Sequence, residues 1–69
     1  MQEKRETPTT EALSLSVDET ASAIGISRAY LYLLLKEGKA PRSFVVGKRR
    51  LFPVSEIHAW LAAQVDNAA

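Results

Sequence analysis

Cysteine is absent from this chain of 69 residues, and histidine occurs once. Without thiols the chain has neither a disulfide framework nor a thiolate metal site, and nothing in it indicates an oxidising compartment, so we expect an intracellular protein. The single histidine, His58, would need carboxylates alone as its further protein partners in a zinc site. The sequence therefore predicts no metal, no cofactor and a surface position for His58.

Long hydrophobic runs are also missing. The longest apolar run covers residues 29–35, whereas a membrane-spanning helix needs about 20 apolar residues. Residues 1–5 lack the apolar stretch of a signal peptide. A chain of this length holds one small domain with no room for a typical substrate cavity. We therefore expect neither a membrane protein nor an enzyme, and we assign no catalytic residue.

The two ends of the chain are polar or rich in small residues, and neither shows apolar periodicity. Such segments bury too little surface to offset the entropy lost on ordering, and chain termini fray unless something holds them. We expect a flexible tail at residues 1–12, a folded domain at residues 13–64 and a second flexible tail at residues 65–69.

Charge is distributed unevenly, although the net charge is only +1. Residues 27–53 carry seven basic residues against one acidic residue, a local charge of +6, while residues 1–26 sum to −3 and residues 54–69 to −2. A cationic segment of this kind attracts polyanions such as nucleic acids. A solvated basic face has the same composition, so charge alone leaves both interpretations open.

Local signals predict two short helices joined by a tight turn. The segment Ser16-Val17-Asp18-Glu19 has the form of a capping box, and Gly25 can adopt the left-handed conformation that ends a helix. Ser27 is a second N-cap candidate, ahead of a run without Gly or Pro that lasts until Gly38. We expect helices over about 17–24 and 28–37, in the pattern of a helix-turn-helix.

The second helix is expected to have a buried side and an exposed side. Leu31, Leu34 and Leu35 share one side at helical spacing, which directs them to the core. The opposite side would be the reading face, and it carries Arg28 at the helix start followed by Ala29, Tyr32, Leu33 and Lys36.

Residues after Pro41 change to a β-prone pattern. Two segments, 44–46 and 49–52, flank Gly47-Lys48 and predict a small hairpin with a cationic tip. We expect its apolar side chains to lie against the helices and its cations to point outward. The inward set is Phe44, Val46 and Phe52, and the outward set is Lys48, Arg49 and Arg50.

A third helix is expected after the hairpin. Ile57, Trp60 and Leu61 recur at helical spacing, so a helix over about 54–64 would close the core, with Trp60 inside it.

Several of these motifs occur in an order that resembles a known family. The sequence carries Glu19 to Ala21 in the first helix, Gly-Ile-Ser-Arg at 25–28, Tyr32, a basic-x-Gly-x-x-Pro segment at 36–41, Gly-Lys-Arg at 47–49 and the segment 53–61. This set is similar to the excisionase and AlpA-type regulators, small winged helix-turn-helix proteins related to MerR-type regulators. The resemblance covers about residues 15–63.

The resemblance implies a mainly α fold with a small two-stranded β wing, in the order helix, helix, hairpin, helix. It also implies sequence-preferring binding of double-stranded DNA in a bacterial cytoplasm, in association with the nucleoid. An excisionase binds and bends attachment-site DNA and directs a tyrosine or serine integrase toward excision, with further copies on adjacent sites. An AlpA-type protein regulates transcription instead. We favour the excisionase, because the chain ends soon after the third helix.

The reading face and the wing supply the candidate DNA-binding residues. Arg28 would reach a guanine edge, and the flanking cations would bind phosphate. Leu33 stands where the family often has arginine. An exposed leucine also fits a small protein-interaction module, and weak salt dependence of binding would distinguish such a module from a DNA-binding protein. The candidates are Ser27, Arg28, Ala29, Tyr30, Tyr32, Leu33 and Lys36 on the helix, and Lys39, Arg42, Lys48, Arg49 and Arg50 on the flank and wing.

Overall fold

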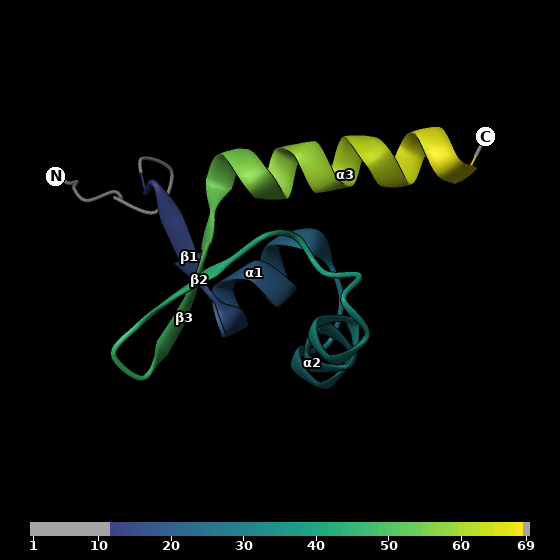
Figure 1. Ribbon diagram of the computed structural model, residues 1–69. Coiled ribbons are helices and arrows are strands. Elements are labelled where there is room, and N and C mark those ends of the chain that lie inside the picture. Colours follow the sequence, from purple (N-terminus) through teal and green to yellow (C-terminus); the bar gives the residue numbers. More distant parts are fainter. Residues whose placement is uncertain (1–11, 69) are drawn as a thin grey trace, which may run out of the picture.

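The computed structural model describes residues 12–68, which form three helices and one three-stranded sheet (Figure 1). The predicted order of helix, helix, hairpin and helix is confirmed, with one additional strand before the first helix. Apart from Ala12, the predicted N-terminal tail lies outside the described residues. The elements are β1 (Ser14–Ser16), α1 (Val17–Ile24), α2 (Arg28–Glu37), β2 (Phe44–Val46), β3 (Arg49–Pro53) and α3 (Val54–Ala68).

Helix α1 has the caps that the sequence predicts. Ser16 Oγ accepts a hydrogen bond from the Glu19 N–H at 3.2 Å, and the Ser16 N–H donates to Glu19 Oε1 at 2.9 Å, which completes the capping box. Gly25 follows the helix in the left-handed conformation, with φ at 86°. The N–H groups of Gly25 and Ile26 donate to carbonyls of the last turn in the Schellman pattern. These local bonds explain why the helix has only eight residues.

Only three residues, 25–27, separate helix α2 from α1. Ser27 Oγ accepts the Tyr30 N–H at 3.1 Å, and Gly38 ends the helix at a φ of 72°. Figure 1 shows α2 nearly end-on while α1 and α3 run across the view, so α2 crosses both. The bounds predicted for α1 and α2 agree with the structure.

The sheet has three strands, and the prediction of two is therefore wrong. Strand β3 lies in the centre and pairs antiparallel with β1 and with β2. The Val54 N–H also donates to the Leu13 carbonyl at 2.9 Å, which extends the pairing of β1 and β3 by one bond. Strand β1 escaped prediction because its three residues, Ser-Leu-Ser, contain one apolar side chain and form a strand only through a partner far along the chain.

The register of the hairpin corrects the expectation for Phe44 and Val46. Phe44 pairs with Leu51 and Val46 with Arg49, so both belong to the face of the sheet opposite to that of Phe52. The two side chains are exposed, whereas Phe52 is fully buried. The predicted turn at 47–48 agrees with this register, but the expectation overlooked that directly paired residues share a face, which joins 44 and 46 to 51 and 49 and not to 52.

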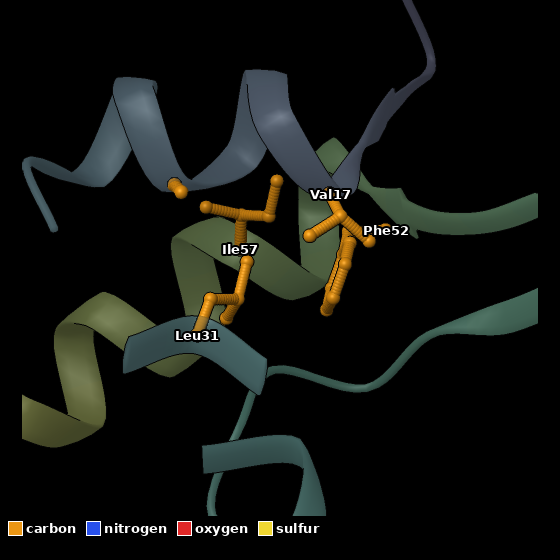
Figure 2. Packing of buried hydrophobic residues seen from close by; sticks show 5 residues of the cluster. Val17, Leu31, Phe52 and Ile57 are labelled. Atoms are coloured by element: carbon orange, nitrogen blue, oxygen red, sulfur yellow. The ribbon is translucent and has the colours of Figure 1, made fainter. Parts of the chain in front are cut away.

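The core lies between the helices and the central strand. Side chains from α1, α2, β3 and α3 meet there (Figure 2). Leu31 and Phe52 are completely shielded from solvent, and burying each contributes roughly 1.5 to 3 kcal/mol of transfer free energy. The cluster consists of Val17, Ala21, Leu31, Phe52 and Ile57.

Helix α3 differs from its prediction in two respects. It continues to Ala68, so residues 65–68, expected to be part of a flexible tail, are helical. Trp60 is half-buried at the rim and is not a member of the core cluster. The Trp60 Nε1–H instead donates to the Lys39 carbonyl at 2.7 Å, which fastens α3 to the segment that leaves α2. Tryptophan needs such a partner for its N–H, and the rim offers one.

Candidate DNA interface

The outer side of α2 exposes most of the residues predicted for the reading face. Leu31 and Leu34 are buried and Leu35 is half-buried, which turns the opposite side outward. Tyr32 and Leu33 retain 53% and 45% of their surface accessible to solvent, values high enough for direct contact with a ligand. The other exposed members of the predicted set on this helix are Ser27, Arg28, Ala29, Tyr30 and Lys36.

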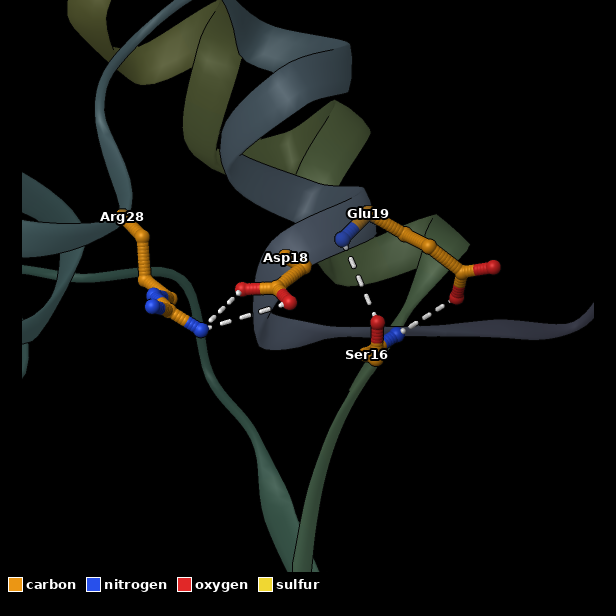
Figure 3. Close-up of polar contacts among 4 residues, drawn as sticks. All are labelled: Ser16, Asp18, Glu19 and Arg28. Atoms are coloured by element: carbon orange, nitrogen blue, oxygen red, sulfur yellow. Dashed lines mark hydrogen bonds and ion pairs between the residues drawn. The ribbon is translucent and has the colours of Figure 1, made fainter.

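Arg28 forms an ion pair that sequence reasoning missed. Its Nη1 lies 3.2 Å from Asp18 Oδ1 and 3.4 Å from Asp18 Oδ2 (Figure 3). Figure 3 shows Asp18 turned toward Arg28, while Glu19 turns toward Ser16. A signal was available, because the capping box assigns a role to Glu19 and leaves Asp18, its neighbour in the first turn of α1, without one.

Tyr30 lies toward a different part of the surface. It lines an open pocket of about 520 Å³ between α2 and α3, which also contains Lys39, Trp60 and Gln64. The sequence analysis expected no room for a typical cavity, and this open pocket corrects that expectation. It was not predicted because α2 and α3 are far apart along the chain. Tyr30 therefore borders both this pocket and solvent, whereas Tyr32 is not among the residues that line the pocket.

The predicted flank cations are all exposed. Lys36 and Lys39 lie at the end of α2, and Arg42 precedes β2. Lys39 Nζ lies 4.0 Å from Glu37 Oε1, an exposed contact at the limit of an ion pair that leaves the ammonium group open to solvent. These three side chains extend the cationic surface from the reading helix toward the hairpin.

The hairpin of β2 and β3, residues 44–53, is called the wing below. Lys48 and Arg49 are exposed at its tip, as predicted. Arg50 corrects the prediction, because it is half-buried and its Nη1 donates to Ser43 Oγ at 2.6 Å. Arg50 lies on the same face of β3 as Phe52, two positions away, and its hydrogen bond to Ser43 accompanies its partial burial. The wing therefore offers two free cations rather than three.

His58 is exposed on α3, and no group of three or more His, Cys, Asp or Glu side chains gathers within residues 12–68. No helix in that range is both long enough and apolar enough to cross a membrane.

Comparison with known protein families matches residues 14–65 to the helix-turn-helix domain. The chain belongs to the helix-turn-helix domain family. The match begins at β1 and ends in the last turns of α3, so it includes the first five elements in full and α3 as far as residue 65. Comparison with curated proteins finds no match.

Membership of the helix-turn-helix family gives each element an expected role. In such domains the second helix of the crossed pair enters the major groove, which corresponds here to α2. The exposed residues of α2 thus occupy the position from which a helix-turn-helix domain reads base edges, and the family is typically non-enzymatic.

Proposed function

We propose that this helix-turn-helix domain binds double-stranded DNA with a sequence preference, placing α2 in the major groove. The observation that carries the proposal is the outer side of α2, where a fixed helix start presents Arg28 together with Tyr32 and Leu33 in one exposed row. A recognition helix contacts base edges mainly through its first turns, and Arg28 is the first residue of α2.

The groups on this surface divide into base-reading and phosphate-binding sets. Arg28 has the fork geometry that recognises guanine O6 and N7, a contact that provides about 1 to 3 kcal/mol of discrimination. Phosphate contacts fix the position of the domain without reading sequence. Tyr32 would reach a phosphate through its hydroxyl, as Ser27 could beside its capping role. The cations of the phosphate set are Lys36, Lys39, Arg42, Lys48 and Arg49.

The wing would contact DNA beside the groove that α2 enters. Lys48 lies in the tight turn with Gly47, Arg49 follows it, and both are exposed, a position in which consecutive cations have no packing role. A narrow minor groove attracts inserted basic side chains. Arg50, held against Ser43, supports the shape of the wing instead of contacting DNA.

The biological role we propose is that of an excisionase. The motifs at 25–28, 36–41 and 47–49 support it, since they resemble those of excisionases and AlpA-type regulators. In that role the protein would bind and bend DNA near an attachment site, together with further copies of itself, and direct an integrase toward excision in the bacterial cytoplasm. Regulation of transcription in the AlpA manner is the second candidate, and footprinting across an attachment region and across promoters would separate the two.

Selection from a pool of randomised duplexes, followed by titration at several salt concentrations, tests DNA binding. We expect an enriched sequence and a linear fall of log K with log salt. If all five phosphate-binding cations make contact, the slope is about −4.5, because each neutralised phosphate contributes roughly −0.9. An unenriched pool, or binding that does not change with salt, would contradict the proposal and favour a protein-interaction module.

A further inference from the structure

The Asp18–Arg28 ion pair points to a second residue that controls base reading. We propose that Asp18 is a positioning residue that raises the sequence specificity of Arg28. It would hold the guanidinium in place and weaken the attraction of Arg28 for phosphate. This inference rests on the proposed function and assigns a specificity role to a residue outside the reading helix.

The geometry leaves Arg28 able to bind a base while it is held. Both contacts to the Asp18 carboxylate come from Nη1, at 3.2 and 3.4 Å. A guanidinium carries five N–H donors, and those on Nη2 and Nε stay available for a two-pronged contact with guanine. The pair also joins the first turn of α1 to the first residue of α2, so the orientation of Arg28 depends on both helices.

The charge of Asp18 discriminates between the two ligands that DNA offers. A phosphate that approaches Arg28 also approaches the Asp18 carboxylate and is repelled by it, whereas a guanine edge is neutral and presents two acceptors. Asp18 therefore penalises the phosphate contact more than the base contact. Specificity is a difference of affinities, and it rises when the competing complex is weakened.

Exposure of the pair argues against a mainly structural role. The Arg28 and Asp18 side chains are 64% and 68% accessible to solvent, and ion pairs this exposed contribute little to folding. The capping bonds of α1 involve Ser16 and Glu19, not Asp18. Asp18→Asn should therefore leave the fold intact, which makes it a clean test.

The experiment compares Asp18→Asn with Asp66→Asn, which removes the same charge from an exposed position on α3. Each variant is titrated with the duplex selected by the wild-type chain and with a scrambled duplex of the same composition. For Asp18→Asn we expect scrambled-duplex affinity to rise about threefold to fivefold, the salt slope to steepen by up to about 0.9, and the selected-to-scrambled ratio to fall. Asp66→Asn should keep the wild-type ratio.

A double variant shows whether Asp18 acts through Arg28. In the Arg28→Ala background, Asp18→Asn should change the ratio no more than Asp66→Asn does. Equal effects of Asp18→Asn and Asp66→Asn in the wild-type background, or equal tightening on both duplexes, would overturn the role of Asp18 while leaving DNA binding in place. A wild-type chain that binds neither duplex would overturn the proposed function as well, so the two failures are distinguishable.

Discussion

Arg28 is the residue on which the proposed sequence preference depends. Replacing it with alanine should lower affinity for the selected duplex by about 1 to 3 kcal/mol, roughly 5-fold to 150-fold, and affinity for a scrambled duplex much less. Arg42→Ala is the matched control, because it removes the same charge from a phosphate-binding position and should weaken both duplexes equally. Fluorescence titration of the two duplexes measures the ratio, and an unchanged ratio for Arg28→Ala would exclude base reading by this side chain.

Leu33 gives a second prediction at this scale, because an exposed leucine on a reading face needs a partner. In the proposed complex Leu33, one turn after Ala29, would face the major groove and contact a thymine methyl group. Leu33→Ala should then weaken binding to a single isolated site, and replacing one thymine of the site with uracil should weaken wild-type binding equally, with no further loss in the variant. Retained single-site affinity with lost cooperativity on tandem sites would instead place Leu33 between neighbouring copies.

Substitution of Thr20 should change the free energy of unfolding rather than DNA binding. Its side chain is fully buried, and its Oγ1 has no hydrogen-bond partner among the described residues. An unpaired buried hydroxyl costs about 1 to 3 kcal/mol, so Thr20→Val should raise the free energy of unfolding by roughly 1 kcal/mol at nearly constant shape. Urea denaturation measures the change. Thr20→Ser, which keeps the hydroxyl and loses the methyl group, should be destabilising, and a stabilised serine variant would contradict this explanation.

At the scale of elements, the sequence predicted correctly those helix ends that are determined by contacts between residues close together in the chain. The ends of α1 and α2 agree with prediction because the caps at Ser16, Gly25, Ser27 and Gly38 form within a few residues along the chain. Strand β1 forms by pairing with the distant strand β3, and the sequence did not predict it. The two-residue turn of the hairpin agrees with prediction, but the face assigned to Phe44 and Val46 was wrong. The candidate site likewise has a part that the sequence predicted and a part that it did not. The outer side of α2 follows from helical spacing, whereas Asp18 reaches Arg28 only through the crossing of two helices.

The wing can be tested as a unit by removing both of its exposed cations together. Replacing both Lys48 and Arg49 with alanine should weaken binding to selected and scrambled duplexes alike, because phosphate contacts carry no sequence information. The salt slope should flatten by about 1.8, which corresponds to two lost phosphate contacts. A thermal melt checks that the fold survives. A double variant with the wild-type slope would show that the wing does not touch DNA.

For the whole molecule, the sequence predicted the charge distribution but not its geometry. All seven cations of the described residues lie within 27–53, and the fold arranges them along α2, the following segment and the wing. Tertiary contacts then give two of the seven a polar partner in another segment, since Arg28 pairs with Asp18 and Arg50 with Ser43. A charge count cannot show this, because both partners are defined by tertiary contacts.

No linker separates β1 from α1 or β3 from α3, and these direct junctions bear on the distance between α2 and the wing. Ser16 ends β1 and caps α1, and Pro53 of β3 is followed directly by Val54 of α3, while β3 also forms half of the wing. The wing is therefore continuous with the sheet on which α1 and α3 pack, and α2 packs in turn on α1. We therefore expect α2 and the wing to contact the double helix as one rigid unit, at a fixed separation. One base pair inserted between the zones touched by α2 and by the wing would rotate them out of phase, and a footprint that lost one zone would reveal it.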